Sequence, residues 1–178
     1  PFLAPLYAWT AVVPQGAYIA PPPMIRLIML HLKDRLEHGA RVVKCLPIEG
    51  GNDEIFRTDA SAEEESATLG GWESRGGTLP KDARWFSATV HKSELPDMFK
   101  GDGGKRTVAA WELLATVLAM IAFRQPTGTE SRGVAVSRGI TDNQGNSFLL
   151  NKLMSTKYPL NVILMQAATT LEMSGQWL

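Results

Sequence analysis

The chain has 178 residues, of which 44% are hydrophobic and 20% charged, as expected for a globular protein with one ordinary domain and an appendage. Eighteen basic and eighteen acidic residues balance to zero net charge, which argues against a stand-alone module that holds nucleic acid by phosphate neutralisation alone. An enzyme with an acidic, metal-holding site is compatible with this balance. The single cysteine, Cys45, excludes an internal disulfide and a cysteine-based zinc site.

The first twenty residues are apolar but are interrupted by prolines at Pro5 and Pro14 and followed by three more at 21–23. A membrane span needs about 20 uninterrupted apolar residues, and a signal peptide needs a basic start and a small-residue cleavage site. We therefore expect an intracellular protein, cytoplasmic or nuclear, that is neither secreted nor in a membrane. The stretch is predicted to be extended or turn structure, followed by a packing or connecting helix over about 23–38.

Beyond residue 51 the pattern changes to short strands joined by turns. Strands are predicted over residues 54–61, 67–74 and 83–90, and three such strands in succession form an antiparallel meander. Trp72 and Trp85 are expected to lie in the core of this meander rather than to act as base-stacking platforms.

Helices and strands then alternate. The sequence predicts a long helix over 106–123, a short strand over 134–140, helices over 144–154 and 160–172, and the first residues of another strand at 176–178. In the long helix, an apolar stripe is expected at Val108, Trp111, Leu114, Leu118 and Ile121. A meander followed by this alternation indicates an α/β protein with a mixed sheet.

Three separated acidic residues are the candidates for chemistry. Asp59 falls towards the end of the first strand, where an aspartate is usually a strand terminator or helix cap. Glu112 lies on the small-residue side of the long helix, which could approach the sheet closely; the alternative is a solvated glutamate. Asp142 ends a strand and begins a helix, where the alternative role is that of N-cap, although Asn143 could cap the helix instead.

Three carboxylates from different elements suit a magnesium site. Magnesium takes oxygen ligands and is usually held by one or two carboxylates together with substrate phosphate. Two such ions roughly 3.5–4 Å apart can activate water and stabilise the leaving oxygen in phosphodiester cleavage.

The segments Thr58-Asp59-Ala60-Ser61, Glu112-Leu113-Leu114-Ala115 and Thr141-Asp142-Asn143 resemble the successive acidic motifs of ribonuclease H domains in retroelement reverse-transcriptase polyproteins. The resemblance covers about residues 52–178 and implies an α/β, ribonuclease H-like mixed sheet. It also implies that Asp59, Glu112 and Asp142 are catalytic and bind metal. The family's fourth carboxylate follows a fifth strand, so the resemblance implies that residues 52–178 are an incomplete domain that lacks its last strand. Residues 1–51 resemble, more weakly, the segment that joins the polymerase to ribonuclease H.

The function implied by this resemblance is hydrolysis of the RNA strand of RNA–DNA hybrids with two Mg²⁺ or Mn²⁺ ions, next to the reverse transcriptase polymerase domain of the same polyprotein. Ser61, Asn143, Lys105 and Arg106 are candidates for substrate binding, with solvated surface as the alternative for the charged pair. Two other functions stay open: a catalytically inactive ribonuclease H-like domain that binds nucleic acid or acts as a scaffold, and an integrase or exonuclease of the same fold.

Overall fold

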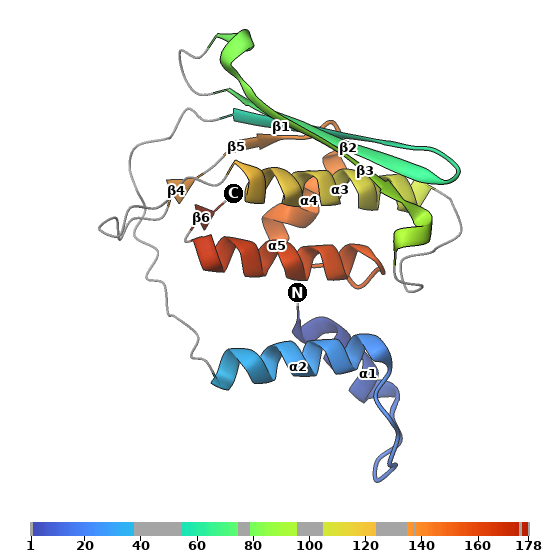
Figure 1. Ribbon diagram of the computed structural model, residues 1–178. Coiled ribbons are helices and arrows are strands. Elements are labelled where there is room, and N and C mark those ends of the chain that lie inside the picture. The colour runs from blue at the N-terminus through green and yellow to red at the C-terminus, as the bar shows by residue number, and fades with distance from the viewer. Residues whose placement is uncertain are drawn as a thin grey trace.

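The computed structural model describes residues 2–37, 55–74, 79–95, 105–123, 135–136, 138–174 and 176–177. Its main sheet has the strand order β3-β2-β1-β5 (Figure 1). In this sheet β1 (Ile55–Ala62), β2 (Ser66–Ser74) and β3 (Arg84–His91) are antiparallel, and β5 (Arg138–Ile140) runs parallel to β1. The same part of the chain also forms η1 (Pro80–Asp82), η2 (Lys92–Glu94), α3 (Lys105–Ala122), α4 (Gln144–Lys152) and α5 (Leu160–Ser174).

The helices form layers on one side of the sheet. Figure 1 shows α3 directly against the sheet and α5 beyond α3, and α4 contacts both of these helices. The other face carries no helix in the described part of the chain. The α/β class and the predicted order, a meander followed by helix, strand and helix, are therefore confirmed.

Helix α3 is buried on two sides, so its buried residues do not form the single stripe that the sequence predicts. Its small residues, Ala115 and Ala119, are fully buried in clusters with the sheet, while Leu113 and Val117 pack in a cluster with α5. The prediction of one stripe was wrong at its ends, because Val108 and Ile121 are 41% and 47% exposed; the other three stripe residues, Trp111, Leu114 and Leu118, do pack in the core. A helix between two layers needs apolar residues on opposite faces rather than on a single stripe.

The prediction of extended structure for the first twenty residues was also wrong for part of that stretch. Residues Leu3–Val12 form helix α1. Pro5 lies in its first turn, where the backbone N–H has no partner within the helix, so proline is tolerated there. Pro14 follows just after the end of the helix.

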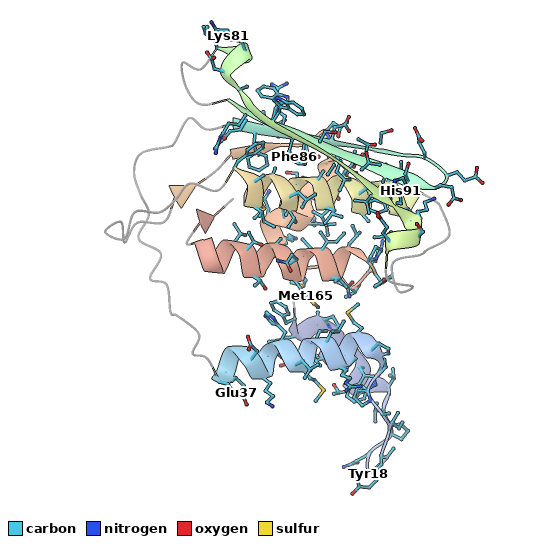
Figure 2. All side chains as sticks on the ribbon, in the orientation of Figure 1. Tyr18, Glu37, Lys81, Phe86, His91 and Met165 are labelled. Atoms are coloured by element: carbon cyan, nitrogen blue, oxygen red, sulfur yellow. The ribbon has the colours of Figure 1, made fainter. Side chains whose placement is uncertain are left out.

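Helix α2 (Pro23–Glu37) confirms the helix predicted over about 23–38. Its buried residues Ile25 and Ile28 cluster with Met165 of α5, and Figure 2 shows Met165 between the two helices. Among the described residues, no helix is both long and apolar enough to cross a membrane.

The sequence predicts a single strand over 134–140, but the structure forms two short strands in this range, and they belong to different sheets. The described part of that range contributes β4 (Ala135–Val136) to a separate two-stranded sheet and β5 to the main sheet. The strand predicted to begin at 176 is present as β6 (Gln176–Trp177) and pairs in parallel with β4.

Trp72 and Trp85 do not lie in the core, so that prediction was wrong. They are 41% and 74% exposed and pair directly across β2 and β3. Successive side chains of a strand point to opposite faces. Because Leu69 of β2 is buried and Phe86 of β3 packs on the core (Figure 2), both tryptophans project from the uncovered face.

An ion pair connects the sheet to the end of α3. Glu73, which is only 4% exposed, pairs with Arg84 across β2 and β3. The Arg84 guanidinium also donates a hydrogen bond of 3.3 Å to the carbonyl oxygen of Phe123. Carbonyls at a helix end lack partners within the helix, so Arg84 satisfies one of them and neutralises the buried Glu73.

Two neighbouring glycines of β2 should respond differently to substitution. A Cβ atom on Gly71 would lie 2.6 Å from the Phe86 ring, whereas a Cβ atom on Gly70 meets nothing closer than 3.8 Å. We expect Gly71→Ala to lower the free energy of unfolding by about 1–3 kcal/mol. Gly70→Ala should leave it unchanged or raise it by up to about 1 kcal/mol, because glycine is unfavourable within a strand.

Urea unfolding followed by circular dichroism measures both values. Equal destabilisation by the two substitutions would show that the packing of Phe86 does not determine the requirement for glycine at position 71.

Candidate functional site

Strands β1 and β5 bring two of the predicted carboxylates to the same edge of the sheet. Arg57 of β1 pairs with Ile140 of the parallel β5, and Asp59 and Asp142 each follow two residues later in the same direction. Neighbouring strands lie roughly 4.8 Å apart. Both carboxylates are exposed and line one open groove of about 590 Å³, whose lining also includes Arg57, Gly70, Trp72 and Trp85.

Asp59 is positioned by the residue that precedes it. The buried Thr58 side chain points to the helical side of the sheet, and its hydroxyl lies 3.0 Å from the hydroxyl of Thr116 in α3. Asp59 therefore points to the opposite, uncovered face. Its Oδ1 atom accepts a hydrogen bond of 2.8 Å from the backbone N–H of Ala60.

Glu112 is half-buried and faces the turn that carries Asp142. Its Oε2 atom accepts hydrogen bonds from the side-chain amides of Asn143, at 2.6 Å, and Asn146, at 3.4 Å. The alternative of a purely solvated glutamate is thereby excluded. The backbone carbonyl of Glu112 also accepts from the Thr116 hydroxyl at 3.1 Å, which extends the network to Thr58.

Asn143, and not Asp142, caps helix α4. The Asn143 Oδ1 atom accepts from the backbone N–H of Asn146 at 3.1 Å, as an N-cap side chain does. Asn146 is 1% exposed, and its amide also donates to the carbonyl of Ala109 in α3 at 2.9 Å. These bonds join α4 to α3 and leave the exposed Asp142 with no capping role.

The donor set fits a metal ion only in part. Within the described residues, no group of three or more His, Cys, Asp or Glu side chains is arranged to hold a metal ion. The Glu112 carboxylate is instead occupied by two amides. Asp59 and Asp142 line the same groove, and this pair matches the one or two carboxylates that hold magnesium together with substrate phosphate.

The residues predicted to bind substrate lie in three different places. Ser61 is exposed on β1, two residues beyond Asp59 and therefore on the same face. Lys105 and Arg106 begin α3, about 10 Å along the helix axis from Glu112, and their side chains lie outside the described part of the structure. Asn143 uses its amide group for the cap and for Glu112.

The sequence interpretation did not single out two parts of the site. Asn146 was not considered, although an asparagine inside the first turn of a helix indicates a side chain with a hydrogen-bonding role. Arg57 and the two tryptophans were not assigned to the groove, where the Arg57 guanidinium lies 5.5 Å from the centre of the Trp72 ring system. Strand alternation relative to Leu69 and Phe86 places the two tryptophans on the same face as Asp59.

No protein-family model and no curated protein sequence matches this chain. Among solved structures, the chain is similar to a crystal structure of RNase H1 from the halophilic archaeon Halobacterium salinarum NRC-1. The two share 16% sequence identity with a TM-score of 0.45, over 70% of this chain and 80% of that chain.

The bond between Asn143 and Glu112 should contribute to stability separately from the cap. Serine is also a good N-cap, so Asn143→Ser keeps the cap but removes the amide that donates to Glu112. We expect Asn143→Ser to lower the free energy of unfolding by about 1–2 kcal/mol, because hydrogen bonds to charged groups are stronger than neutral ones. Asn143→Ala loses the cap as well and should cost about 1 kcal/mol more.

Denaturant unfolding of the two variants and of the unsubstituted protein tests this order. If Asn143→Ser were as stable as the unsubstituted protein, the charged hydrogen bond would not hold α4 to α3.

Proposed function

We propose that this chain carries a ribonuclease H-type site that hydrolyses the RNA strand of RNA–DNA hybrids with two Mg²⁺ or Mn²⁺ ions. The observation that carries this proposal is the shared groove of Asp59 and Asp142 at the ends of neighbouring parallel strands. Glu112 supports it, because its carboxylate is bonded to Asn143, the residue directly after Asp142. These are the three acidic residues that the resemblance implies.

The roles of the protein groups follow from their positions. Asp59 and Asp142 are the exposed carboxylates that would hold divalent ions, which supply charge neutralisation for attack of water on the scissile phosphodiester. The products of such hydrolysis are a 3′-hydroxyl and a 5′-phosphate. Glu112 accepts hydrogen bonds from the amides of Asn143 and Asn146, which hold its carboxylate beside the turn that carries Asp142.

Glu112 would join the metal ligands through its second carboxylate oxygen while it stays bonded to the two asparagines. A carboxylate has lone pairs for about four hydrogen-bond or metal contacts, and only Oε2 accepts from Asn143 and Asn146. Its other oxygen makes no hydrogen bond recorded among the described residues. A shared role as ligand and as hydrogen-bond acceptor is therefore compatible with the geometry.

The retroelement setting is also part of the proposal: residues 1–51 connect to a reverse transcriptase polymerase domain and residues 52–178 form the ribonuclease H-like domain, all within an intracellular polyprotein. The exposed side of α2 would make a further contact with that polymerase domain. Leu27, Met29 and Leu30 are about half exposed, whereas Ile25 and Ile28 pack against α5. Neighbouring exposed apolar residues of this kind suit a protein interface.

A catalytically inactive domain that binds hybrid is the second candidate. It is favoured by the arrangement of the carboxylates, because Glu112 is engaged by asparagines and no metal-holding group of three is formed in the described residues. The two candidates differ in cleavage, not in binding.

Cleavage of a 5′-labelled RNA strand within an RNA–DNA hybrid tests the proposal. We expect cleavage with Mg²⁺ or Mn²⁺ and none with EDTA. Asp59→Asn and Asp142→Asn should each lower the rate about 100-fold or more, because loss of a metal ligand removes several kcal/mol of transition-state stabilisation. Asp82→Asn, which changes an exposed aspartate in η1, is the matched control and should cleave like the unsubstituted protein.

The outcomes separate the candidates. Binding of hybrid without cleavage at any concentration of either metal ion would support the inactive domain. Equal cleavage by all four proteins would place the activity outside the groove.

A further inference from the structure

We propose that the uncovered face of the sheet binds a single-stranded segment of nucleic acid, whose bases stack on Trp72 and Trp85 beside the carboxylates. We call Arg57, Trp72 and Trp85 the tryptophan face. This inference rests on the proposed function for the identity of the ligand as nucleic acid. It adds a binding surface for an unpaired strand, which hydrolysis of a hybrid does not itself require.

The tryptophan face is one row of side chains across neighbouring strands. In the register of the sheet, Arg57 of β1 pairs with Trp72 of β2, and Trp72 pairs with Trp85 of β3. The next row on the same face contains Asp59, which pairs with Gly70. Trp72 and Asp59 are thus diagonal neighbours, roughly 7–8 Å apart, so a strand on the tryptophans reaches the carboxylates within one or two nucleotides.

The chemistry of the row suits flat aromatic ligands. Trp85 is 74% exposed, and stacking another ring on such a large aromatic surface is favourable because it removes apolar surface from water. The Arg57 guanidinium, 5.5 Å from the centre of the Trp72 ring system, adds a planar cation that can stack on a base or contact a phosphate. Aromatic rings beside a cation form the stacking platform on which proteins hold single strands.

Gly70 provides a second, independent observation. A Cβ atom there would meet only the Phe86 carbonyl oxygen at 3.8 Å, so packing does not require glycine. At Gly71, in contrast, the Phe86 ring leaves no room for a side chain. Gly70 lines the groove opposite Asp59, and its missing side chain leaves the floor open between the tryptophans and the carboxylates.

A single strand fits this face better than a duplex does. In a duplex the faces of the bases are covered by their neighbours in the stack, whereas unpaired bases offer both faces to protein aromatic rings. The segment that we infer is therefore unpaired nucleic acid next to the hybrid, and not the hybrid itself.

Fluorescence anisotropy of labelled oligonucleotides in EDTA tests binding without cleavage. We expect single-stranded RNA and DNA to bind more tightly than a blunt RNA–DNA hybrid and to quench tryptophan fluorescence. Trp72→Ala and Trp85→Ala should each weaken single-strand binding by at least about fivefold, whereas Trp85→Phe should retain most of it. Gly70→Thr should weaken binding comparably by filling the groove, while its stability is unchanged or higher, since threonine favours strands.

Tyr18→Ala is the matched control, because Tyr18 is a fully exposed aromatic residue in the segment between α1 and α2; it should bind like the unsubstituted protein. Circular dichroism of each variant reports whether the fold is retained. Unchanged affinity in both tryptophan variants would overturn the inference. Absence of oligonucleotide binding would also overturn it and would assign the face to a protein partner.

The test is independent of catalysis. Tryptophan-dependent binding without any cleavage of hybrid would keep this inference and remove the proposed function. Metal-dependent cleavage with no effect of the tryptophans on single-strand binding would do the reverse.

Discussion

The arrangement of the site depends on the hydrogen bonds that the Glu112 carboxylate accepts from Asn143 and Asn146. A half-buried carboxylate is costly unless donors compensate for its lost hydration, and these amides do so. Because Asn143 also caps α4, the bond fixes the start of that helix, and with it Asp142, relative to α3. The Thr58–Thr116 pair fixes β1 to the same helix. Helix α3 therefore positions both Asp59 and Asp142.

The two faces of the sheet meet different requirements. On the covered face, packing decides each position: a Cβ atom on Gly139 would lie 2.4 Å from the Phe56 ring, so only glycine lets β5 approach that ring. On the uncovered face, packing decides little, and polar, charged and aromatic residues share one surface. Thr58 and Asp59 show the division within two adjacent residues, since one holds the strand on the helix and the other lines the groove.

Much of the fold follows from local patterns, because alternation and helix periodicity are properties of neighbouring residues. The order of strands and helices was predicted in this way. Helix α1 differs from the prediction because Pro5 occupies its first turn, where proline is compatible with a helix. The partners of Glu112 could not be predicted, because Asn146 lies 34 residues further along the chain and only the tertiary fold brings them together. Trp72 and Trp85 contradict the prediction because strand alternation, and not apolar bulk, determines which face a side chain takes.

The charge balance of the chain links the carboxylate groove to the tryptophan face. Eighteen acidic and eighteen basic residues leave no net attraction for a polyanion, and the carboxylates of Asp59 and Asp142 repel phosphate locally. A chain without excess positive charge therefore gains less affinity from counterion release than a basic protein does. Stacking on aromatic rings does not depend on phosphate charge, so it can hold a nucleic acid strand beside acidic residues. The proximity of Trp72 to Asp59 in the sheet register thus gives a physical reason why an acidic hydrolytic site and a binding surface would share one face.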